Sequence, residues 1–271
     1  MFLKVIFLIL ILASPAYAQA QKEISAARQR LIDSERVLGA QESVASVPIY
    51  FDFDNKIGVA HQGSTQYTKI FPYLPYRLNS NYSYVVLPTI QYQTFNNFDG
   101  YSGSGLNPIL IQSYFTQSNP ENRRNTFGVG PMMQIRTNMP AMFGSAQNAA
   151  GYTVNAVHRT ENWVVGIDGY QSFGLGPAPT TSLSANNVFF RPFITHITKN
   201  FGNYTLDTES IINIDTGLHS YPINLMGSKL IDIGDESFLF TLGVRYYTVN
   251  TMIGGAQGWG GRIGLTYAFP H

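Results

Sequence analysis

From residue 48 onward, the chain alternates apolar and polar residues with a period of two, and clusters of turn residues interrupt the alternation. Such alternation is typical of β-strands with two different faces. We expect strands near 49–60, 66–78, 82–95, 107–117, 124–136, 151–160, 163–174, 187–199, 202–215, 220–232, 237–250 and 257–269. Most of these segments exceed the roughly five or six residues of a globular strand, which suits strands that cross a membrane at a tilt.

The last segment shows the alternation most clearly. One face carries Trp259, Ile263, Tyr267 and Phe269, and the other face is small or polar. In a soluble sheet the apolar face would point into a core, whereas in a membrane barrel it would point outward into lipid. Gly264, Tyr267 and Phe269 also resemble the C-terminal insertion signal of bacterial barrels, which predicts the barrel-insertion machinery as a partner.

The connections between segments sort by length. If the first strand starts from the periplasm, the turns on that side are short, at 79–81, 161–162, 200–202 and 234–235, and somewhat longer at 118–123. Those on the other side include long stretches rich in Gly, Ser, Asn and Pro, at 96–106, 137–150 and 174–186. Outer-membrane barrels show this asymmetry. The sequence therefore predicts an all-β fold, a transmembrane antiparallel up-and-down β-barrel of about twelve strands over 47–271.

Charged residues fall repeatedly on the polar parity of these strands. An Arg or Lys that faces lipid near the bilayer midplane costs about 2–4 kcal/mol, so we expect the charges to face the lumen. The expected pore-lining residues are Lys69, Arg77, Arg136, Asp168, Arg191, Asp207, Glu209, Asp215, Arg245 and Arg262. They form either a charged constriction or ligand-binding wall in a pore, or ion pairs that brace a narrow, filled barrel.

The first 46 residues differ from the rest of the chain. Lys4, the apolar run 5–12 and the small residues Ala16 and Ala18 have the form of a secretory signal peptide, so we expect 1–18 to be removed on export. In 19–46, apolar residues at helical spacing alternate with many charges, which predicts a short N-terminal helix. This helix would lie either in the periplasm or inside the lumen as a plug.

Composition agrees with a barrel that faces outer-membrane lipids. Charged residues make up 12% of the chain, about half the usual share, while aromatic residues reach 14% and cysteine is absent. After the signal peptide, no apolar run is long enough for a helical span. Without Lys4, the 16 remaining basic residues equal the 16 acidic ones, so no nucleic-acid partner is expected.

Candidate catalytic chemistry is sparse. His219 and Ser220 beside Asp215 form the one local cluster of serine-hydrolase type, and we interpret it as polar residues of a solvated loop. Asp207 and Glu209 share a face and could serve acid–base chemistry or bind calcium, but pore lining beside arginines is the better interpretation. Since the sequence has no metal-binding, phosphate-binding or dinucleotide motif, we expect no enzyme activity, cofactor or metal.

Several short motifs occur in a characteristic order over 48–270. They are Phe71-Pro72-Tyr73-Leu74-Pro75-Tyr76, Pro88, Gly103-Ser104-Gly105-Leu106, Phe127-Gly128-Val129-Gly130-Pro131, Trp163-Val164-Val165-Gly166, Arg191-Pro192-Phe193-Ile194 and the final strand. In this order they resemble the outer-membrane barrels grouped under the name "MetA-pathway of phenol degradation".

The resemblance implies a porin-like channel or transporter of the Gram-negative outer membrane that passes small solutes, aromatic or hydrophobic ones among them. Two other classes of function stay open. The barrel could be a hydrolase that acts on lipid or ester, or a closed structural barrel.

Overall fold

The chain forms fifteen strands in the part that the structure, a computed structural model, describes. The described residues are 45–58, 61–117, 124–137, 139, 147–177, 184–198, 202–233, 236–252 and 255–268. The predicted signal peptide, the predicted N-terminal helix up to residue 44, and Phe269 lie outside them. Within these ranges, no helix is both long and apolar enough to cross a membrane.

The strands follow the predicted segments closely. They are β1 (Ser46–Ile57), β2 (Gly63–Ile70), β3 (Leu74–Arg77), β4 (Tyr82–Phe98), β5 (Tyr101–Leu106), β6 (Ile109–Gln117), β7 (Asn125–Ile135), β8 (Ala149–Arg159), β9 (Trp163–Gly174), β10 (Asn187–Ile197), β11 (Gly202–Asp207), β12 (Ser210–Asn213), β13 (His219–Ile233), β14 (Glu236–Asn250) and β15 (Gly258–Ala268).

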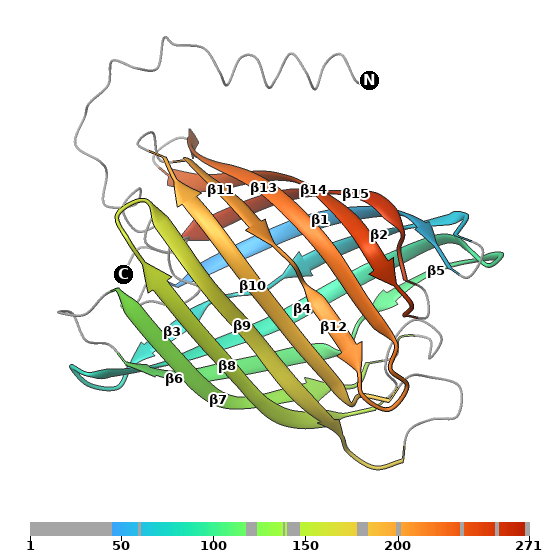
Figure 1. Cartoon of the computed structure of the whole chain (residues 1–271), viewed down its shortest axis with the longest axis horizontal. Helices are drawn as coiled ribbons and strands as arrows, with labels where there is room; N and C mark the ends of the chain where they lie inside the picture. The colour runs from blue at the N-terminus through green and yellow to red at the C-terminus, as the bar shows by residue number, and fades with distance from the viewer. Residues whose placement is uncertain are drawn as a thin grey trace, which may run out of the picture.

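These strands build one closed, antiparallel barrel with twelve strand positions around its wall, each of which we call a stave (Figure 1). Three staves consist of two strands in line: β2 with β3, β5 with β6, and β11 with β12. The order follows the chain, and the sheet closes where β1 pairs with β15 and β9 pairs with β10. The predicted up-and-down barrel of about twelve strands is therefore confirmed.

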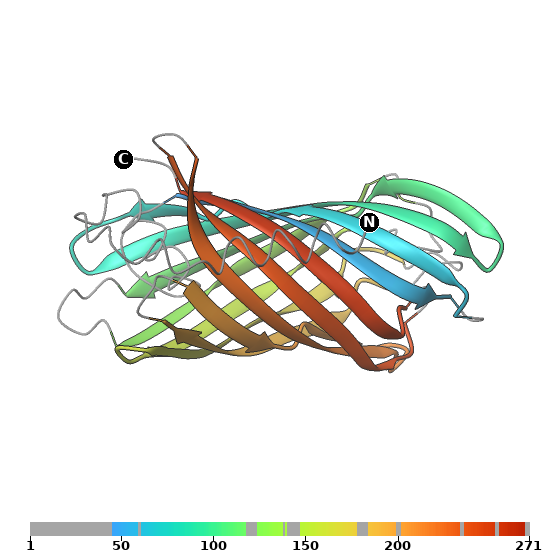
Figure 2. The same cartoon turned by 90° about the horizontal axis from the view of Figure 1, so that it is seen from above.

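One predicted loop is a hairpin. We expected an irregular connection at 96–106, but β4 extends to Phe98 and pairs with β5. Asn97, Asp99 and Gly100 adopt positive φ angles, which Asn, Asp and Gly tolerate better than other residues and which turn the chain sharply. The hairpin of β4 and β5 projects beyond the neighbouring strands (Figure 2).

The two ends of the barrel differ. At the turn end, where β1 begins and β15 ends, the backbone turns tightly: the Thr160 amide donates to the Trp163 carbonyl (2.8 Å) and the Thr198 amide donates to that of Gly202 (2.9 Å). At the opposite loop end, strands are joined by longer connections such as those between β7 and β8 and between β9 and β10. The structure thus separates short turns from long loops as the sequence predicted.

The two faces of the sheet also differ. Along β7, the side chains of Phe127, Val129 and Met133 are exposed on the outside, whereas Gln134 is buried on the inside. The same holds along β9, where Trp163 is exposed and Asp168 is buried. An apolar outer band with a polar interior is the arrangement that a lipid bilayer requires.

Candidate functional site

Two arginines on adjacent strands share one carboxylate at the centre of the lumen. Arg262 of β15 donates from Nε and Nη2 to the two oxygens of Asp52 on β1 (2.6 and 2.8 Å), a bidentate pair. Arg245 of β14 donates from Nη2 to Asp52 (3.0 Å) and from Nη1 to Asp54 (3.2 Å). All four side chains are buried. In this group of four residues, two arginines are balanced by two aspartates.

Glu209 joins this network from another part of the wall. It accepts hydrogen bonds from Arg262 Nη2 (3.0 Å) and Arg245 Nη2 (3.1 Å), and it lies 3.8 Å from Lys69 Nζ of β2. Between the stave of Glu209 and β2 stand β13, β14, β15 and β1. Contact between residues so far apart around the wall means that Glu209 reaches across the lumen.

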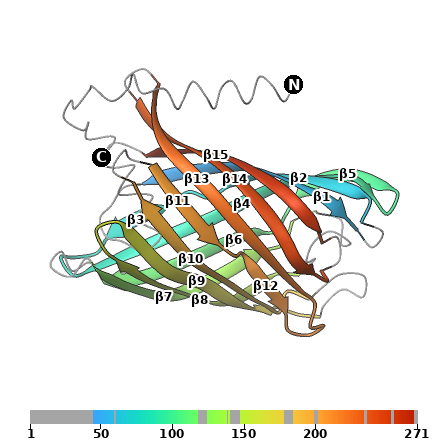
Figure 3. The same ribbon diagram turned by 45° about the horizontal axis from the view of Figure 1, so that its top comes forward.

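Two prolines explain why the chain leaves the sheet at Glu209. The ninth stave is interrupted at 208–209, between β11 and β12 (Figure 3). Asp207 pairs with Phe193 on one side and with Asn224 on the other, so the next positions face Pro192 and Pro222. Proline has no N–H to donate to a neighbouring strand. The Thr208 amide still donates to the Pro192 carbonyl (3.3 Å), but neither proline donates a hydrogen bond in return, so regular pairing stops here and Glu209 turns toward the lumen.

A second pair extends the charges around the wall. Arg191 of β10 donates from Nε to Asp168 of β9 (2.7 Å). Asn224 of β13 links the two groups of charges, since it donates to Asp207 (2.6 Å) and accepts from Arg245 Nε (2.7 Å). We name the set Asp52, Asp54, Lys69, Asp168, Arg191, Asp207, Glu209, Arg245 and Arg262 the charged belt.

The opposite wall carries uncharged polar groups at its centre. Gln112 of β6 donates from Nε2 to Thr153 Oγ1 of β8 (3.1 Å) and to the Tyr114 hydroxyl (3.3 Å). Gln93 of β4 donates to Thr65 Oγ1 of β2 (3.2 Å). The lumen is therefore asymmetric, with charges concentrated from β9 around to β2.

Each cation of the belt lies near an aromatic ring. Lys69 lies 5.3 Å from the ring centre of Phe71, and Arg191 lies 5.9 Å from that of Phe193. Arg245 lies 5.9 Å from Tyr247, which also donates to Asp54 (2.8 Å). In these three pairs the ring follows the cation by two residues, so both side chains point to the same side of the strand.

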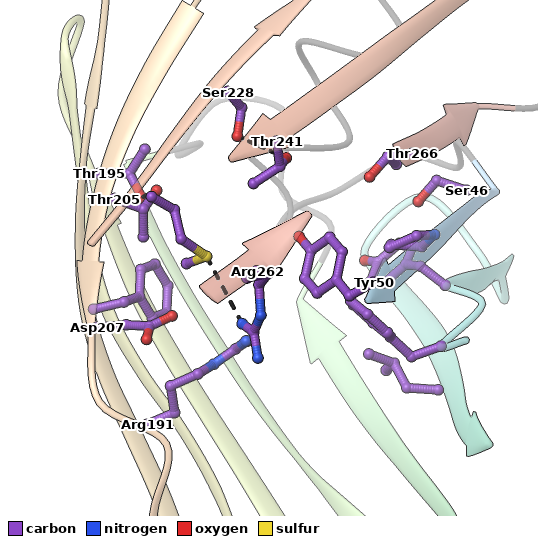
Figure 4. Close-up of a pocket in the computed structure, with 16 residues that line it drawn as sticks. Ser46, Tyr50, Arg191, Thr195, Thr205, Asp207, Ser228, Thr241, Arg262 and Thr266 are labelled. Carbon is purple, nitrogen blue, oxygen red and sulfur yellow. Dashed lines mark hydrogen bonds between the residues drawn. The ribbon is translucent and has the colours of Figure 1, made fainter. Parts of the chain in front are cut away.

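The belt borders a cavity of about 90 Å³ on its turn-end side, which we name the chamber. Figure 4 shows Arg191 and Arg262 extending into it from different parts of the wall. The chamber also has hydroxyl groups, since the Thr195 and Thr205 hydroxyls bond to each other (2.8 Å), as do those of Ser228 and Thr241 (2.9 Å). Its lining thus combines charges, hydroxyls and aromatic rings.

An apolar cluster lies on the other side of the belt, toward the loop end. Ile57, Phe95, Phe98, Met139 and Ala256 are buried together there. Met139 belongs to the connection between β7 and β8, and its side chain is buried in this cluster inside the barrel. Along the barrel axis, an apolar zone, the charged belt and the chamber therefore follow one another.

Seven of the ten expected pore-lining residues lie in the charged belt. The other three, Arg77, Arg136 and Asp215, are exposed near strand ends and lie outside it. Arg77 donates to the Asn79 carbonyl (3.4 Å), and Asp215 accepts from Asn186 (2.7 Å). Residue parity alone could not separate these groups, because parity gives the face of a strand but not the depth along the barrel.

Sequence reasoning missed Asp52, Asp54 and Tyr247. A signal for the two aspartates was present, because they alternate with Phe51 and Phe53, each of which is 42% exposed on the outer face. Tyr247 shares the inner parity of Arg245.

Among the residues of the predicted insertion signal, Gly264 is buried against Tyr50, where a Cβ would overlap its ring, and Tyr267 contacts Phe238 at 5.3 Å between ring centres. Recognition by the insertion machinery stays a prediction.

The hydrolase-like cluster does not assemble as a triad. His219 Nδ1 lies 2.9 Å from the Gly217 carbonyl, and Asp215 bonds to Asn186. Within the described ranges, no hydrogen bond joins the side chains of His219, Ser220 and Asp215. Nor do these ranges contain a group of three or more His, Asp or Glu residues arranged to hold a metal ion.

Comparison with solved structures identifies the fold. An outer-membrane channel from Pseudomonas putida F1 superposes with a TM-score of 0.67 at 10% identity, covering 85% of this chain and 97% of that one. The chain has the fold of an outer-membrane β-barrel channel. Weaker matches are the KdgM porin (TM-score 0.48, 9% identity, 83% and 99% covered) and the Salmonella typhi outer membrane phospholipase dimer with bound calcium (0.44, 9%, 92% and 99%).

No family model and no curated protein sequence matches the chain. The match to the Pseudomonas putida channel supports the resemblance to the phenol-degradation barrels at the level of fold. No sequence match confirms it.

Proposed function

We propose that this protein is a channel of the bacterial outer membrane that passes small solutes passively, aromatic or hydrophobic ones among them. The fold supports this proposal, since it has an apolar outer band for lipid and a polar lumen. The observation that carries it is the charged belt, which concentrates paired charges in one segment of the lumen next to a cavity.

Within this proposal, the belt acts as the constriction, and Glu209 is its crossing group. A solute that passes must separate Glu209 from at least one of its partners on β2, β14 and β15. Rings of charged side chains select ions in other channels through the same kind of contact. The alternative, a belt that merely braces a closed barrel, uses the same contacts but allows no current.

Planar-bilayer recordings of the mature chain test the proposal. We expect discrete conductance steps, and we expect Glu209→Gln to enlarge them, because the variant loses the charge that holds Lys69, Arg245 and Arg262 across the lumen. Since this substitution lowers the number of carboxylates in the belt from five to four, against four cations, the reversal potential in a salt gradient should move toward anion selectivity.

Asp215→Asn is the matched control, because Asp215 is an exposed carboxylate outside the belt. Its currents should equal those of the parent protein. Absence of current in both the parent and the Glu209→Gln variant would reject the channel in favour of the closed barrel. Equal currents and equal selectivity in both would reject Glu209 as part of the constriction.

A further inference from the structure

We propose that the chamber is a binding site for a small monocyclic aromatic carboxylate. The inference rests on the proposed channel function, because a solute that crosses the barrel would occupy the chamber next to the belt. It names the chemical class of that solute from the groups that line the cavity. Three observations carry it: a free face of Arg191, a set of aromatic walls, and the balance of charge in the lining.

Arg191 presents hydrogen-bond donors that the protein itself does not use. Its Nε donates to Asp168, and within the described part of the chain its two terminal amino groups have no hydrogen-bond partner. The guanidinium group nevertheless lies within the barrel and reaches into the chamber (Figure 4). A pair of terminal amino groups is the face with which arginine binds a carboxylate in bidentate geometry.

Aromatic side chains form the walls beside these donors. Tyr50 and Phe71 meet edge to face, with ring centres 5.0 Å apart and planes at 71°, and Tyr73 and Phe193 also line the cavity. Such walls favour a planar ring, which can stack or pack edge-on against them. A cavity of about 150 Å³ accepts benzene in another protein. The chamber, at about 90 Å³, is smaller than that cavity but is open on one side, so a single ring would extend partly into the opening and two rings would not fit.

The charges in the lining favour an anion. Arg191 and Arg262 line the chamber together with one carboxylate, that of Asp207, whose Oδ1 accepts from Asn224. Arg262 already binds Asp52 and Glu209, so it offers no free donors, and Arg191 is the cation of the lining that has donors left for a ligand. A cationic ligand would meet two guanidinium groups, and a neutral ring would leave the donors of Arg191 unpaired. A carboxylate avoids both costs.

Titration calorimetry of the refolded mature chain in detergent tests the site with three probes. Benzoate carries both the ring and the charge, acetate carries the charge alone, and benzyl alcohol carries the ring alone. We expect saturable binding of benzoate that is about tenfold or more tighter than that of either other probe, since each lacks one set of contacts.

The variant Arg191→Gln combined with Asp168→Asn removes the guanidinium without leaving its partner carboxylate unpaired. We expect this double variant to bind benzoate about tenfold or more weakly, while its affinity for benzyl alcohol stays unchanged. Arg136→Gln is the matched control, because it removes an exposed arginine outside the chamber. Heat-modifiable gel mobility establishes that each variant forms a folded barrel.

Absence of saturable benzoate binding, or equal benzoate affinity in the parent and the double variant, would overturn the site. Benzyl alcohol binding as tightly as benzoate would overturn the carboxylate assignment. The same preparations are recorded in bilayers. A barrel that conducts but binds no benzoate refutes this inference and leaves the channel standing. A barrel that binds benzoate through Arg191 but never conducts supports the site and refutes the channel.

Discussion

At the scale of single residues, buried charges are arranged so that each has partners. Asp52 accepts three hydrogen bonds, two from Arg262 and one from Arg245. Burial of an ionised group costs several kcal/mol unless opposite charges and hydrogen bonds compensate it. Substitution of any one belt residue is therefore expected to destabilise the barrel, because the charges that remain would be buried without compensation.

We predict that Asp52→Asn lowers the free energy of unfolding of the barrel by about 3–5 kcal/mol, the cost of breaking a buried ion pair from one side. The reason is that Arg262 and Arg245 lose a shared carboxylate while they stay buried. Urea titration of the protein folded into lipid vesicles measures this change. Asp215→Asn, at an exposed position, should leave the midpoint where it is, and equal midpoints for both variants would contradict the prediction.

For seven of the nine belt residues, the sequence predicted which face of the strand they occupy, but it did not predict their partners. Alternation with apolar neighbours indicated that Asp168 and Arg245 point inward, and both are buried. The contact between Glu209 and Lys69 could not be predicted, because it depends on the stagger of staves that are far apart around the barrel. Residue parity also gives no depth along the barrel, so the sequence predicted that the exposed Arg77 and Arg136 line the pore together with the buried charges.

At the scale of elements, the outer band fixes the position of each strand in the bilayer. Along β13, Leu225 lies near the middle of the strand and Ile233 lies at its turn end, and both side chains are largely exposed, at 54% and 58%. Their identical parity and different depth make them a matched pair for probing the apolar band.

We predict that Leu225→Arg destabilises the folded barrel by about 2–4 kcal/mol, whereas Ile233→Arg costs about 0–1 kcal/mol. The difference arises because a charge at the bilayer midplane is desolvated and a charge near the interface reaches water. Unfolding titrations in vesicles of one lipid composition give both values. Equal costs for the two variants would show that β13 does not span the membrane at the depth that the structure indicates.

Strand boundaries were predicted well where the alternation was regular, and less well where hydrogen bonding interrupts it. The predicted segment 202–215 is two strands, β11 and β12, since Pro192 and Pro222 deprive residues 208 and 209 of donors on the neighbouring strands. The interruption is invisible in the segment itself because its cause lies in two other strands. Similarly, β5 was missed because Ser and Gly dominate its sequence.

At the scale of the whole molecule, the separation of short turns from long loops predicts the orientation in the membrane. In outer-membrane barrels the short turns face the periplasm and the long loops face outward. Ser80 lies in the turn between β3 and β4 at the turn end, and Ser102 lies in the hairpin of β4 and β5 at the loop end. Both are exposed, and the chain contains no cysteine.

We predict that a Ser102→Cys variant reacts with a membrane-impermeant maleimide on intact cells, whereas Ser80→Cys reacts only after the outer membrane is opened. Gel-shift detection of the labelled barrel measures both reactions, and the cysteine-free parent protein provides the background. Labelling of Ser80→Cys on intact cells without labelling of Ser102→Cys would mean that the barrel is inserted in the reverse orientation.

The pairing of Asp52 with Arg262 also bears on how the barrel closes. These residues lie directly opposite each other on β1 and β15, the first and last strands of the barrel, whose pairing closes it. A slip of one residue would turn the buried charges of one strand toward lipid, and a slip of two would set Asp52 against Gly260 or Gly264. The ion pair between Asp52 and Arg262 thus favours the native register of β1 against β15. The same charges that line the lumen therefore also select the correct closure of the barrel.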